Sequence, residues 1–191
     1  PDMAFGTGTH PSTQLCMLAL EKYGVKDMDV IDIGTGSGIL AIEAAKLGAK
    51  WILGVDNDPE AIPSAINNAA LNGVSEKIFF EVGTHTDVLN RKHEPRHAPR
   101  VIANILSPIL ANMLATGLTD LVSPTGLLFL GGFHRFLAFK IGKIGLGLAR
   151  RSLLVRGNLG NFLPLNHLIA IINQNCFNHA AGRGGNLRFT G

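Results

Sequence analysis

The sequence predicts an α/β protein whose mostly parallel, twisted sheet carries helices on both faces. Short aliphatic runs that read as buried strands alternate with segments of helical periodicity, which is the pattern of repeated β-α-β units. A glycine-rich turn, GTGSG at 34–38, joins the first such strand to a helix. The chain has 191 residues, 46% hydrophobic and 16% charged, so one domain of ordinary size can bury a full core.

The helices are predicted from apolar spacing and from residues that favour helix ends. Pro11 suits the first turn of a helix whose apolar stripe is Leu15, Leu18 and Ala19. Asp58 is expected to cap a later helix, because its carboxylate can accept from free backbone N–H groups. One helix is expected to begin at Pro11. The other expected helices cover 39–47, about 59–72, and Pro108 to about Leu121.

The strands are predicted from short aliphatic runs that turn residues interrupt. Pro124 to Gly126 forms one such turn. The apolar run 168–172 is expected to complete the sheet as an edge strand. The other expected strands are 30–33, 51–55, 78–82, 101–104 and 127–130.

Several classes of protein and site are excluded by simple counts. No run of 18 apolar residues is present, so neither a membrane span nor a membrane partner is expected. Cys16 and Cys176 lie 160 positions apart, which excludes a disulfide framework and a cysteine-based zinc site. The stretch 93–97, HEPRH, matches a zinc-protease pattern, but Pro95 and Pro99 oppose the helix that this pattern requires. No metal is therefore predicted.

The glycine turn at 34–38 is the first candidate binding segment. Ligands of parallel sheets bind at the carboxyl ends of the strands, where this turn lies. Gly34 and Gly36 permit a close backbone approach, and the following helix start offers free N–H groups. The dinucleotide pattern G-x-G-x-x-G requires glycine at position 39, where Ile39 stands. The pattern that remains is D-x-G-x-G-x-G, whose acid is Asp32. The alternative interpretation is a tight turn that binds no ligand.

Asp56 ends the second predicted strand, 22 residues after Gly34. An acid at about this spacing can accept hydrogen bonds from both hydroxyls of a ribose. The alternative is that Asp56, like Asp58, only caps the next helix.

These motifs resemble the class I S-adenosylmethionine-dependent methyltransferases. The resemblance rests on VIDIGTGSGILAIEAAKLGA at 30–49 and on GVDNDPEAI at 54–62. The flanking segments PDMAFGTGTHPST at 1–13 and ANILSPIL at 103–110 are similar to the bacterial methyltransferases of large-subunit ribosomal protein eleven. The resemblance extends over about residues 2–131.

The resemblance implies a fold, a cofactor and a substrate. It implies a seven-stranded Rossmann-like sheet, S-adenosylmethionine as cofactor, and methylation of lysine side chains and an N-terminal amine on a ribosomal protein. It also implies a cytoplasmic location. We expect a monomer that has no direct nucleic-acid partner.

The family's site residues transfer by position. Thr13 would contact the cofactor, Gly34 and Gly36 would pack on it, and Asp56 would hold its ribose. Asn104 would lie beside the sulfonium and the target amine. The loop 5–10 would close over the site and bring Thr9 to the cofactor. His10 is a candidate proton acceptor, or else part of the turn, and His85 is expected to line the adenine pocket.

The chemistry explains why an amide at position 104 suits an amine substrate. A free lysine is protonated at neutral pH, whereas the nucleophile must be neutral. The side-chain oxygen of Asn104 can accept from the amine without taking its proton. The stretch Asn104 to Ser107 has no aromatic residue, which argues against a flipped base as substrate. The alternative for Asn104 is a turn residue at the helix entry.

The last part of the chain departs from the family pattern. Residues 121–191 hold eight Lys and Arg but no acid, whereas all 14 acids lie in 1–120. We expect a cofactor-binding core at 1–131 and an atypical segment at 132–191, which a shifted reading frame, a fused sequence or a nucleic-acid-binding extension would each explain. The family's substrate-recognition domain precedes the segment with which this chain begins, so we expect a part of a longer protein.

Three other functions remain open from the sequence. The first is a class I methyltransferase that acts on a small molecule or on RNA. The second is a nicotinamide-dependent oxidoreductase, although Ile39 speaks against it. The third is a non-catalytic remnant that binds the cofactor but modifies nothing.

Overall fold

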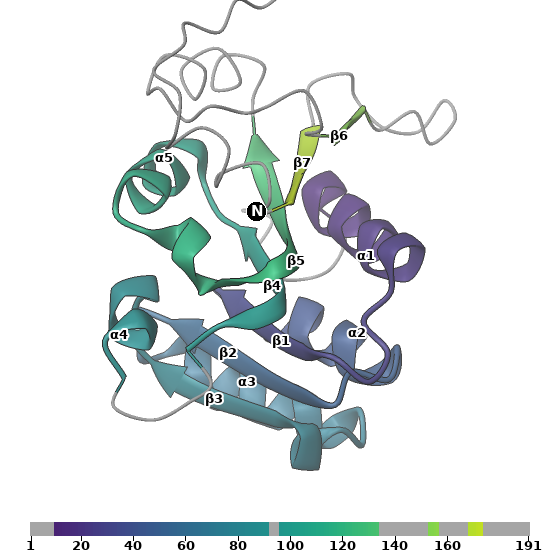
Figure 1. Cartoon of the computed structure of the whole chain (residues 1–191). Helices are drawn as coiled ribbons and strands as arrows, with labels where there is room; N and C mark the ends of the chain where they lie inside the picture. The colour runs from purple at the N-terminus through teal and green to yellow at the C-terminus, as the bar shows by residue number, and fades with distance from the viewer. Residues whose placement is uncertain (1–9, 92–95, 134–152, 157–167, 174–191) are drawn as a thin grey trace, which may run out of the picture.

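A central sheet lies between two layers of helices in the computed structural model (Figure 1). The structure describes residues 10–91, 96–133, 153–156 and 168–173. The helices are α1 (Pro11–Tyr23), α2 (Ile39–Lys46), α3 (Ala61–Leu71), α4 (His85–Leu89) and α5 (Ser107–Ala115), with short 3-10 turns η1 (Ser75–Lys77) and η2 (Leu118–Leu121). The strands are β1 (Asp29–Ile33), β2 (Trp51–Asp56), β3 (Ile78–Val82), β4 (Ala98–Asn104), β5 (Val122–Phe133), β6 (Leu153–Arg156) and β7 (Leu168–Asn173).

The sheet has the strand order β3-β2-β1-β4-β5-β7-β6. Its first five strands are parallel, and β7 runs antiparallel to both β5 and β6. The predicted fold class, a mostly parallel sheet with helices, is therefore confirmed. The strand predicted at 168–172 is also confirmed, but β7 lies inside the sheet and β6 forms its border.

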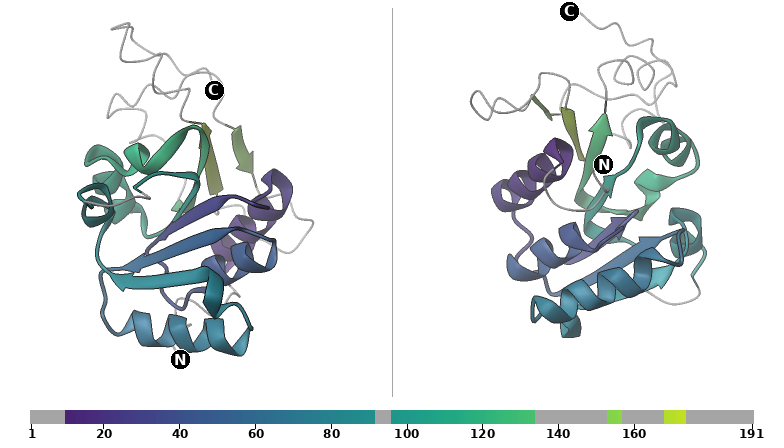
Figure 2. Two further views of the ribbon diagram at one scale, coloured as in Figure 1. Left: turned by 60° about the horizontal axis from the view of Figure 1, so that its bottom comes forward. Right: turned by 180° about the vertical axis from the view of Figure 1, so that it is seen from behind.

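Each face of the sheet has its own hydrophobic core. Helices α1, α2 and α3 cover one face, and α4 and α5 cover the other, as the two views in Figure 2 show. Alternate residues of the strands serve the two cores: Ile102 and Phe129 pack on the α1 side, whereas Val101 and Leu128 pack on the α5 side.

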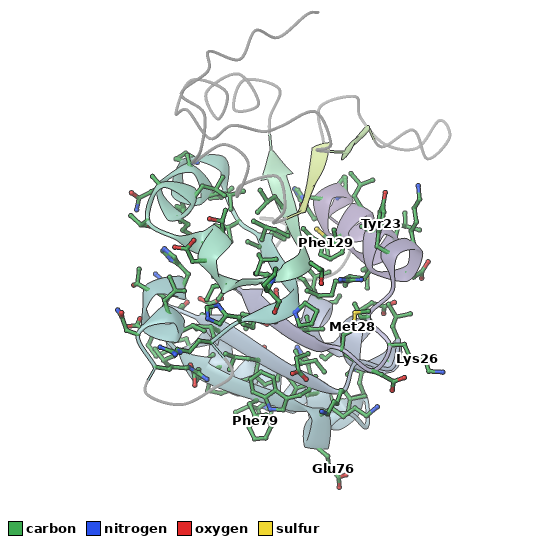
Figure 3. The ribbon with its side chains drawn as sticks, viewed as in Figure 1. Tyr23, Lys26, Met28, Glu76, Phe79 and Phe129 are labelled. Carbon is green, nitrogen blue, oxygen red and sulfur yellow. The ribbon has the colours of Figure 1, made fainter. Side chains whose placement is uncertain are left out.

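Helix α1 is held against the sheet by both apolar and polar contacts. The rings of Tyr23 and Phe129 lie 6.3 Å apart, centroid to centroid (Figure 3). Arg100 on β4 donates from Nε to the carbonyl of Gly24 at 2.9 Å and from Nη2 to that of Tyr23 at 3.2 Å. These bonds satisfy carbonyl groups at the end of α1 and tie the helix to β4.

The structure corrects several predicted boundaries. Leu18 is 38% exposed, so it lies outside the buried stripe that Leu15 and Ala19 form. The helix predicted to reach Leu121 ends at Ala115, because Gly117 has a φ of +100° that interrupts it before η2. The residues between Val122 and Leu127 form an irregularity within β5, where a turn before the strand was predicted. Within the described residues, no helix has the length and apolar character needed to span a membrane.

Candidate functional site

A pocket of about 730 Å³ opens at the carboxyl ends of β1, β2, β3 and β4. This is the edge of the sheet where the sequence predicted ligand binding. The pocket lining comes mainly from the glycine turn, the ends of β2, β3 and β4, the start of α1, and α5. Those residues are His10, Ser12, Thr13, 33–36, Ile39, Leu40, Asp56, Asn57, 83–86, 104–106, Ile109, Asn112, Met113, Thr116 and Gly132.

The glycine turn after β1 has the conformation that its sequence requires. Gly34 and Gly36 have φ values of +71° and +53°, which disfavour residues that carry a Cβ. The N–H of Gly34 donates to the carbonyl of Val55 at 2.7 Å, and this bond anchors the turn to β2. A Cβ on Gly34 would lie 2.7 Å from the side chain of Ile105, whereas one on Gly36 would meet no atom within 4 Å. The turn is therefore packed at Gly34 and open at Gly36.

Asp56 reaches from β2 to the glycine turn. Its Oδ2 accepts from the N–H of Gly36 at 2.8 Å, and its Oδ1 accepts from the N–H of Asp58 at 3.0 Å. Each carboxylate oxygen can accept more than one hydrogen bond, so capacity for ribose hydroxyls remains. The prediction that Asp58 caps the next helix is wrong: α3 begins at Ala61, and Asp58 instead accepts from the N–H of Glu60 within the preceding turn.

Asn104 and Thr13 meet at the pocket, although 91 positions separate them in the chain. Nδ2 of Asn104, at the end of β4, donates to Oγ1 of Thr13 on α1 at 3.0 Å. Thr13 is buried and Asn104 is half-buried. Within the described ranges, no hydrogen bond to Oδ1 of Asn104 is found. The structure thus brings together two residues that the resemblance assigned to the cofactor.

His10 lines the pocket as the N-cap of α1. Its Nδ1 lies 2.8 Å from Oγ of Ser12 and accepts from the N–H of Ser12 at 3.3 Å. With Nδ1 as acceptor, the neutral ring carries its proton on Nε2, so a proton-acceptor role for His10 would require Nδ1 to give up its bond with Ser12. Thr9, the other residue predicted from this loop, lies outside the described residues.

His85 begins α4, a short helix that no pattern in the sequence predicted. Its Nε2 lies 2.8 Å from Oγ1 of Thr116, beyond the end of α5, and the residue is buried at the pocket wall. Because Oγ1 of Thr116 donates to the carbonyl of Asn112, it accepts from His85, which places the imidazole proton on Nε2. Desolvation lowers the pKa of His85, so the neutral ring is favoured.

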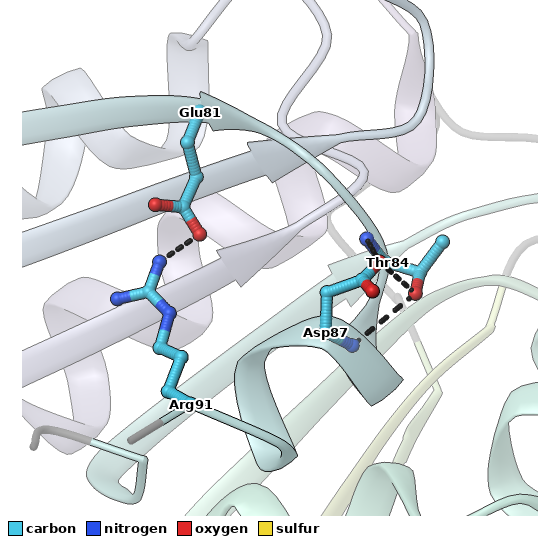
Figure 4. A network of polar contacts seen from close by, with 4 residues as sticks. All are labelled: Glu81, Thr84, Asp87 and Arg91. Carbon is cyan, nitrogen blue, oxygen red and sulfur yellow. Dashed lines mark hydrogen bonds and ion pairs between the residues drawn. The ribbon is translucent and has the colours of Figure 1, made fainter. Parts of the chain in front are cut away.

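Helix α4 begins with a capping box. Oγ1 of Thr84 accepts from the N–H of Asp87 at 3.4 Å, and the N–H of Thr84 donates to Oδ2 of Asp87 at 2.8 Å (Figure 4). Glu81 on β3 pairs with Arg91 just beyond the helix. These contacts set the place of α4, and hence of His85, relative to β3.

Asp32 contributes to the site, although the sequence indicated only that it is the acid that precedes the glycine turn. It is 1% exposed on β1, and its Oδ2 accepts from Oγ1 of Thr35 in the glycine turn at 2.8 Å. Burial raises the pKa of Asp32 to about 7; the hydrogen bond from Thr35 lowers it, the charge of Asp56 raises it, and a hydrogen bond from the backbone of Ala41 lowers it. Asp32 thus links the turn to the interior of the protein.

The wall formed by α5 was also missed. Four residues at helical spacing face the pocket: Ile109, Asn112, Met113 and Thr116. The polar residues Asn112 and Thr116, on an otherwise apolar segment, were the sequence signal that could have predicted this wall.

Of the HEPRH stretch, the structure describes only Arg96 and His97, and neither lines the pocket. Residues 92–95 lie outside the described residues, and Nδ1 of His97 lies 2.7 Å from the carbonyl oxygen of Asp120. In the part of the chain that the structure describes, no three His, Cys, Asp or Glu side chains gather as metal ligands would.

The pocket has features that suit a nucleoside cofactor. The open backbone at Gly36 allows close approach, and the carboxylate of Asp56 lies beside it to receive ribose hydroxyls. His85 closes the wall after β3, where an adenine was predicted. Fold and site together define a Rossmann-like domain of the S-adenosylmethionine-dependent methyltransferase class.

Comparisons with known proteins agree with this class and narrow it. An RNA methyltransferase from Salinibacter ruber, solved in complex with S-adenosyl-L-homocysteine, shares the fold at a TM-score of 0.61 and 18% identity, covering 84% of this chain and 90% of that one. The family model described as "Ribosomal protein L11 methyltransferase (PrmA)" matches residues 1–135. The chain belongs to the ribosomal protein L11 methyltransferase family.

Individual relatives from this family match part of the chain. The ribosomal protein L11 methyltransferase of Geobacter metallireducens is 58% identical over 78 residues, which are 41% of this chain and 26% of that protein. The one from Clostridium botulinum strain Eklund 17B is 55% identical over 92 residues, 48% of this chain and 29% of that protein. These matches span less than a third of each relative. The solved ribosomal protein L11 methylase of Lactobacillus delbrueckii has a TM-score of 0.68 and 33% identity, covering 87% of this chain and 80% of that one.

Proposed function

We propose that this chain carries the catalytic core of a protein N-methyltransferase, which uses S-adenosylmethionine to methylate lysine and N-terminal amines of ribosomal protein L11. The observation that carries the proposal is the amide of Asn104, held by Thr13 at the pocket. Membership of the family supports it. A ribosomal protein as substrate would place the reaction in the cytoplasm.

The pocket supplies what methyl transfer to an amine requires. The bound cofactor would supply a methyl group already activated by its sulfonium, so the protein's task is mainly to position and desolvate the amine. Oδ1 of Asn104 can accept from an N–H of the neutral amine and orient its lone pair. Ile105 and Met113 provide apolar lining that favours the uncharged form. His10 lines the same pocket and is the candidate to receive the released proton.

The test compares Asn104→Ala with Asn72→Ala, an exposed asparagine that bonds to Lys46 away from the pocket. Methylation of L11 is measured by mass spectrometry, and S-adenosylmethionine binding by calorimetric titration with NAD as the control ligand. We expect Asn104→Ala to lower the rate by about a hundredfold while the cofactor still binds, because positioning is lost. Asn72→Ala should behave as the wild type.

The outcomes separate the alternatives. If Asn104→Ala methylates L11 at the wild-type rate, the orienting role is wrong. If the wild-type chain binds S-adenosylmethionine but methylates only RNA or a small molecule, the substrate assignment is wrong. Binding without any methylation would support a non-catalytic remnant, and preferential binding of NAD would support the oxidoreductase.

A further inference from the structure

Gly131 lies directly beside Asn104 in the sheet. The two residues are register partners on the parallel strands β5 and β4, so their side-chain directions share the face that α1 covers. Glycine inside a strand is unfavourable by about 0.5–1 kcal/mol and often marks a close approach of another group. The groups around position 131 therefore explain why a glycine stands there.

The surroundings of Gly131 are filled by the Asn104 amide. A Cβ on Gly131 would overlap Oδ1 of Asn104 and lie 2.9 Å from its Cγ and 3.0 Å from Sγ of Cys16. Gly131 has no positive φ, in contrast to its neighbour Gly132 at +80°. The backbone at position 131 could therefore keep its conformation with an alanine. Glycine is needed there because a Cβ would have no room.

The amide is thus held from two sides. Thr13 binds Nδ2, and the empty side-chain position of Gly131 receives Oδ1. The amide cannot retreat toward Cys16, because that side chain is fully buried in the α1 core. An added methyl group would therefore displace the amide from its bond with Thr13 or turn it in the pocket.

We propose that Gly131 is a positioning residue for methyl transfer: its missing side chain provides the space in which Oδ1 of Asn104 is held to orient the target amine. This inference rests on the proposed function for its catalytic consequence. Thr13 is the second positioning residue, because its hydroxyl accepts from Nδ2 and holds the amide against α1.

The experiment compares Gly131→Ala with Gly126→Ala in the full chain. Gly126 lies on the same strand and is also crowded, since its Cβ would lie 2.7 Å from Val122 and 2.8 Å from the carbonyl of Pro99, but it is not part of the pocket lining. We expect Gly131→Ala to lower kcat for L11 methylation by about a hundredfold. Gly126→Ala should lower the melting temperature and leave kcat unchanged.

A double-mutant cycle tests whether the effect acts through Asn104. With Asn104→Ala already present, Gly131→Ala should cause no further loss of kcat, because the displaced group is absent. Thr13→Val should lower kcat as Gly131→Ala does, whereas Thr13→Ser, which keeps the hydroxyl, should restore most of it. If the losses from Gly131→Ala and Asn104→Ala multiply, the proposal is overturned.

A readout without activity keeps the proposal independent of the substrate. The side-chain amide signal of Asn104, assigned in ¹⁵N NMR spectra by its loss in Asn104→Ala, should shift in Gly131→Ala but not in Gly126→Ala. An unmoved signal in Gly131→Ala would refute the positioning contact. A shifted signal in a protein whose wild type does not methylate L11 would support the contact and reject the proposed substrate.

Discussion

The carboxylate of Asp56 accepts hydrogen bonds from two backbone N–H groups, those of Gly36 and Asp58. A charged acceptor of this kind holds the glycine turn in its open conformation before any ligand arrives. Cofactor binding then requires less ordering of the backbone, which lowers the entropic cost of association. The residue thus has a structural role that its spacing in the sequence did not reveal.

Asp32 is the residue whose protonation we expect to affect stability. Burial raises its pKa to about 7 from 3.8, so the folded state binds a proton more tightly than the unfolded state. The free energy of unfolding should therefore fall as pH rises between the two pKa values, by about 1.4 kcal/mol per pH unit from this group alone. Asp56 and Cys16 are the titratable groups coupled to it.

The prediction is tested by urea unfolding of the wild type and Asp32→Asn between pH 5 and 8. The variant should gain stability relative to the wild type as pH rises to about 7 and show no further gain above it. A difference that stays constant over this range would show that Asp32 is not buried as described. Asp120→Asn, on η2, serves as the control.

At the scale of elements, the capping box of α4 fixes a helix of only five residues. So short a helix has little intrinsic stability, and its cap and its packing must hold it. Thr84 and Asp87 form the cap, and the buried Val88 anchors the helix in the α5-side core. The position of His85 at the pocket depends on both.

Thr84→Ala should lower the free energy of unfolding by about 1 kcal/mol, because the cap loses its side-chain acceptor. Thr84→Ser should keep most of this stabilisation, because serine retains the hydroxyl acceptor. Hydrogen bonds from Thr84 lower the pKa of Asp87, so its stabilising effect is present above the ordinary Asp pKa and is lost as pH falls. The gap between wild type and Thr84→Ala, measured by chemical unfolding, should therefore narrow in acid; a gap that widens would contradict this account.

At the scale of the whole molecule, cofactor binding and folding are coupled, because the pocket exists only when β1, β2, β4, α1 and α5 are in place. S-adenosylmethionine at a hundred times its Kd should raise the free energy of unfolding by about 2.7 kcal/mol. At that same ligand concentration, Asp56→Ala should lose most of the gain, because a charge-assisted contact of about 2–3 kcal/mol is removed. Thermal unfolding with and without S-adenosylmethionine measures this gain in the wild type and in Asp56→Ala. NAD is the control ligand.

Absence of a shift with S-adenosylmethionine in a folded chain would show that the pocket does not bind it. A full shift in Asp56→Ala would show that this carboxylate does not hold the ribose. Asp58→Ala provides the matched variant, since among the described residues its carboxylate bonds to the N–H of Glu60 within the turn before α3.

Much of the fold was predictable because its signals are local. The glycine turn, the aliphatic runs and Asp56 at a strand end are each visible within a few residues, and parallel topology brings strand ends to one edge. The fold class and the five parallel strands followed from this. The end of α5 was mispredicted because apolar spacing continues past Gly117, where the backbone conformation breaks the helix.

The rest of the site depends on contacts between distant parts of the chain. The sequence alone determined the class of the fold, the place of the glycine turn, and the family to which Thr13 and Asn104 point. Only the tertiary structure decided that Asp32 is buried, that α5 forms a wall, and that Gly131 leaves room for the Asn104 amide. Local patterns specify backbone conformation, whereas burial and steric fit arise only when the sheet brings its strands side by side and α1 packs upon them.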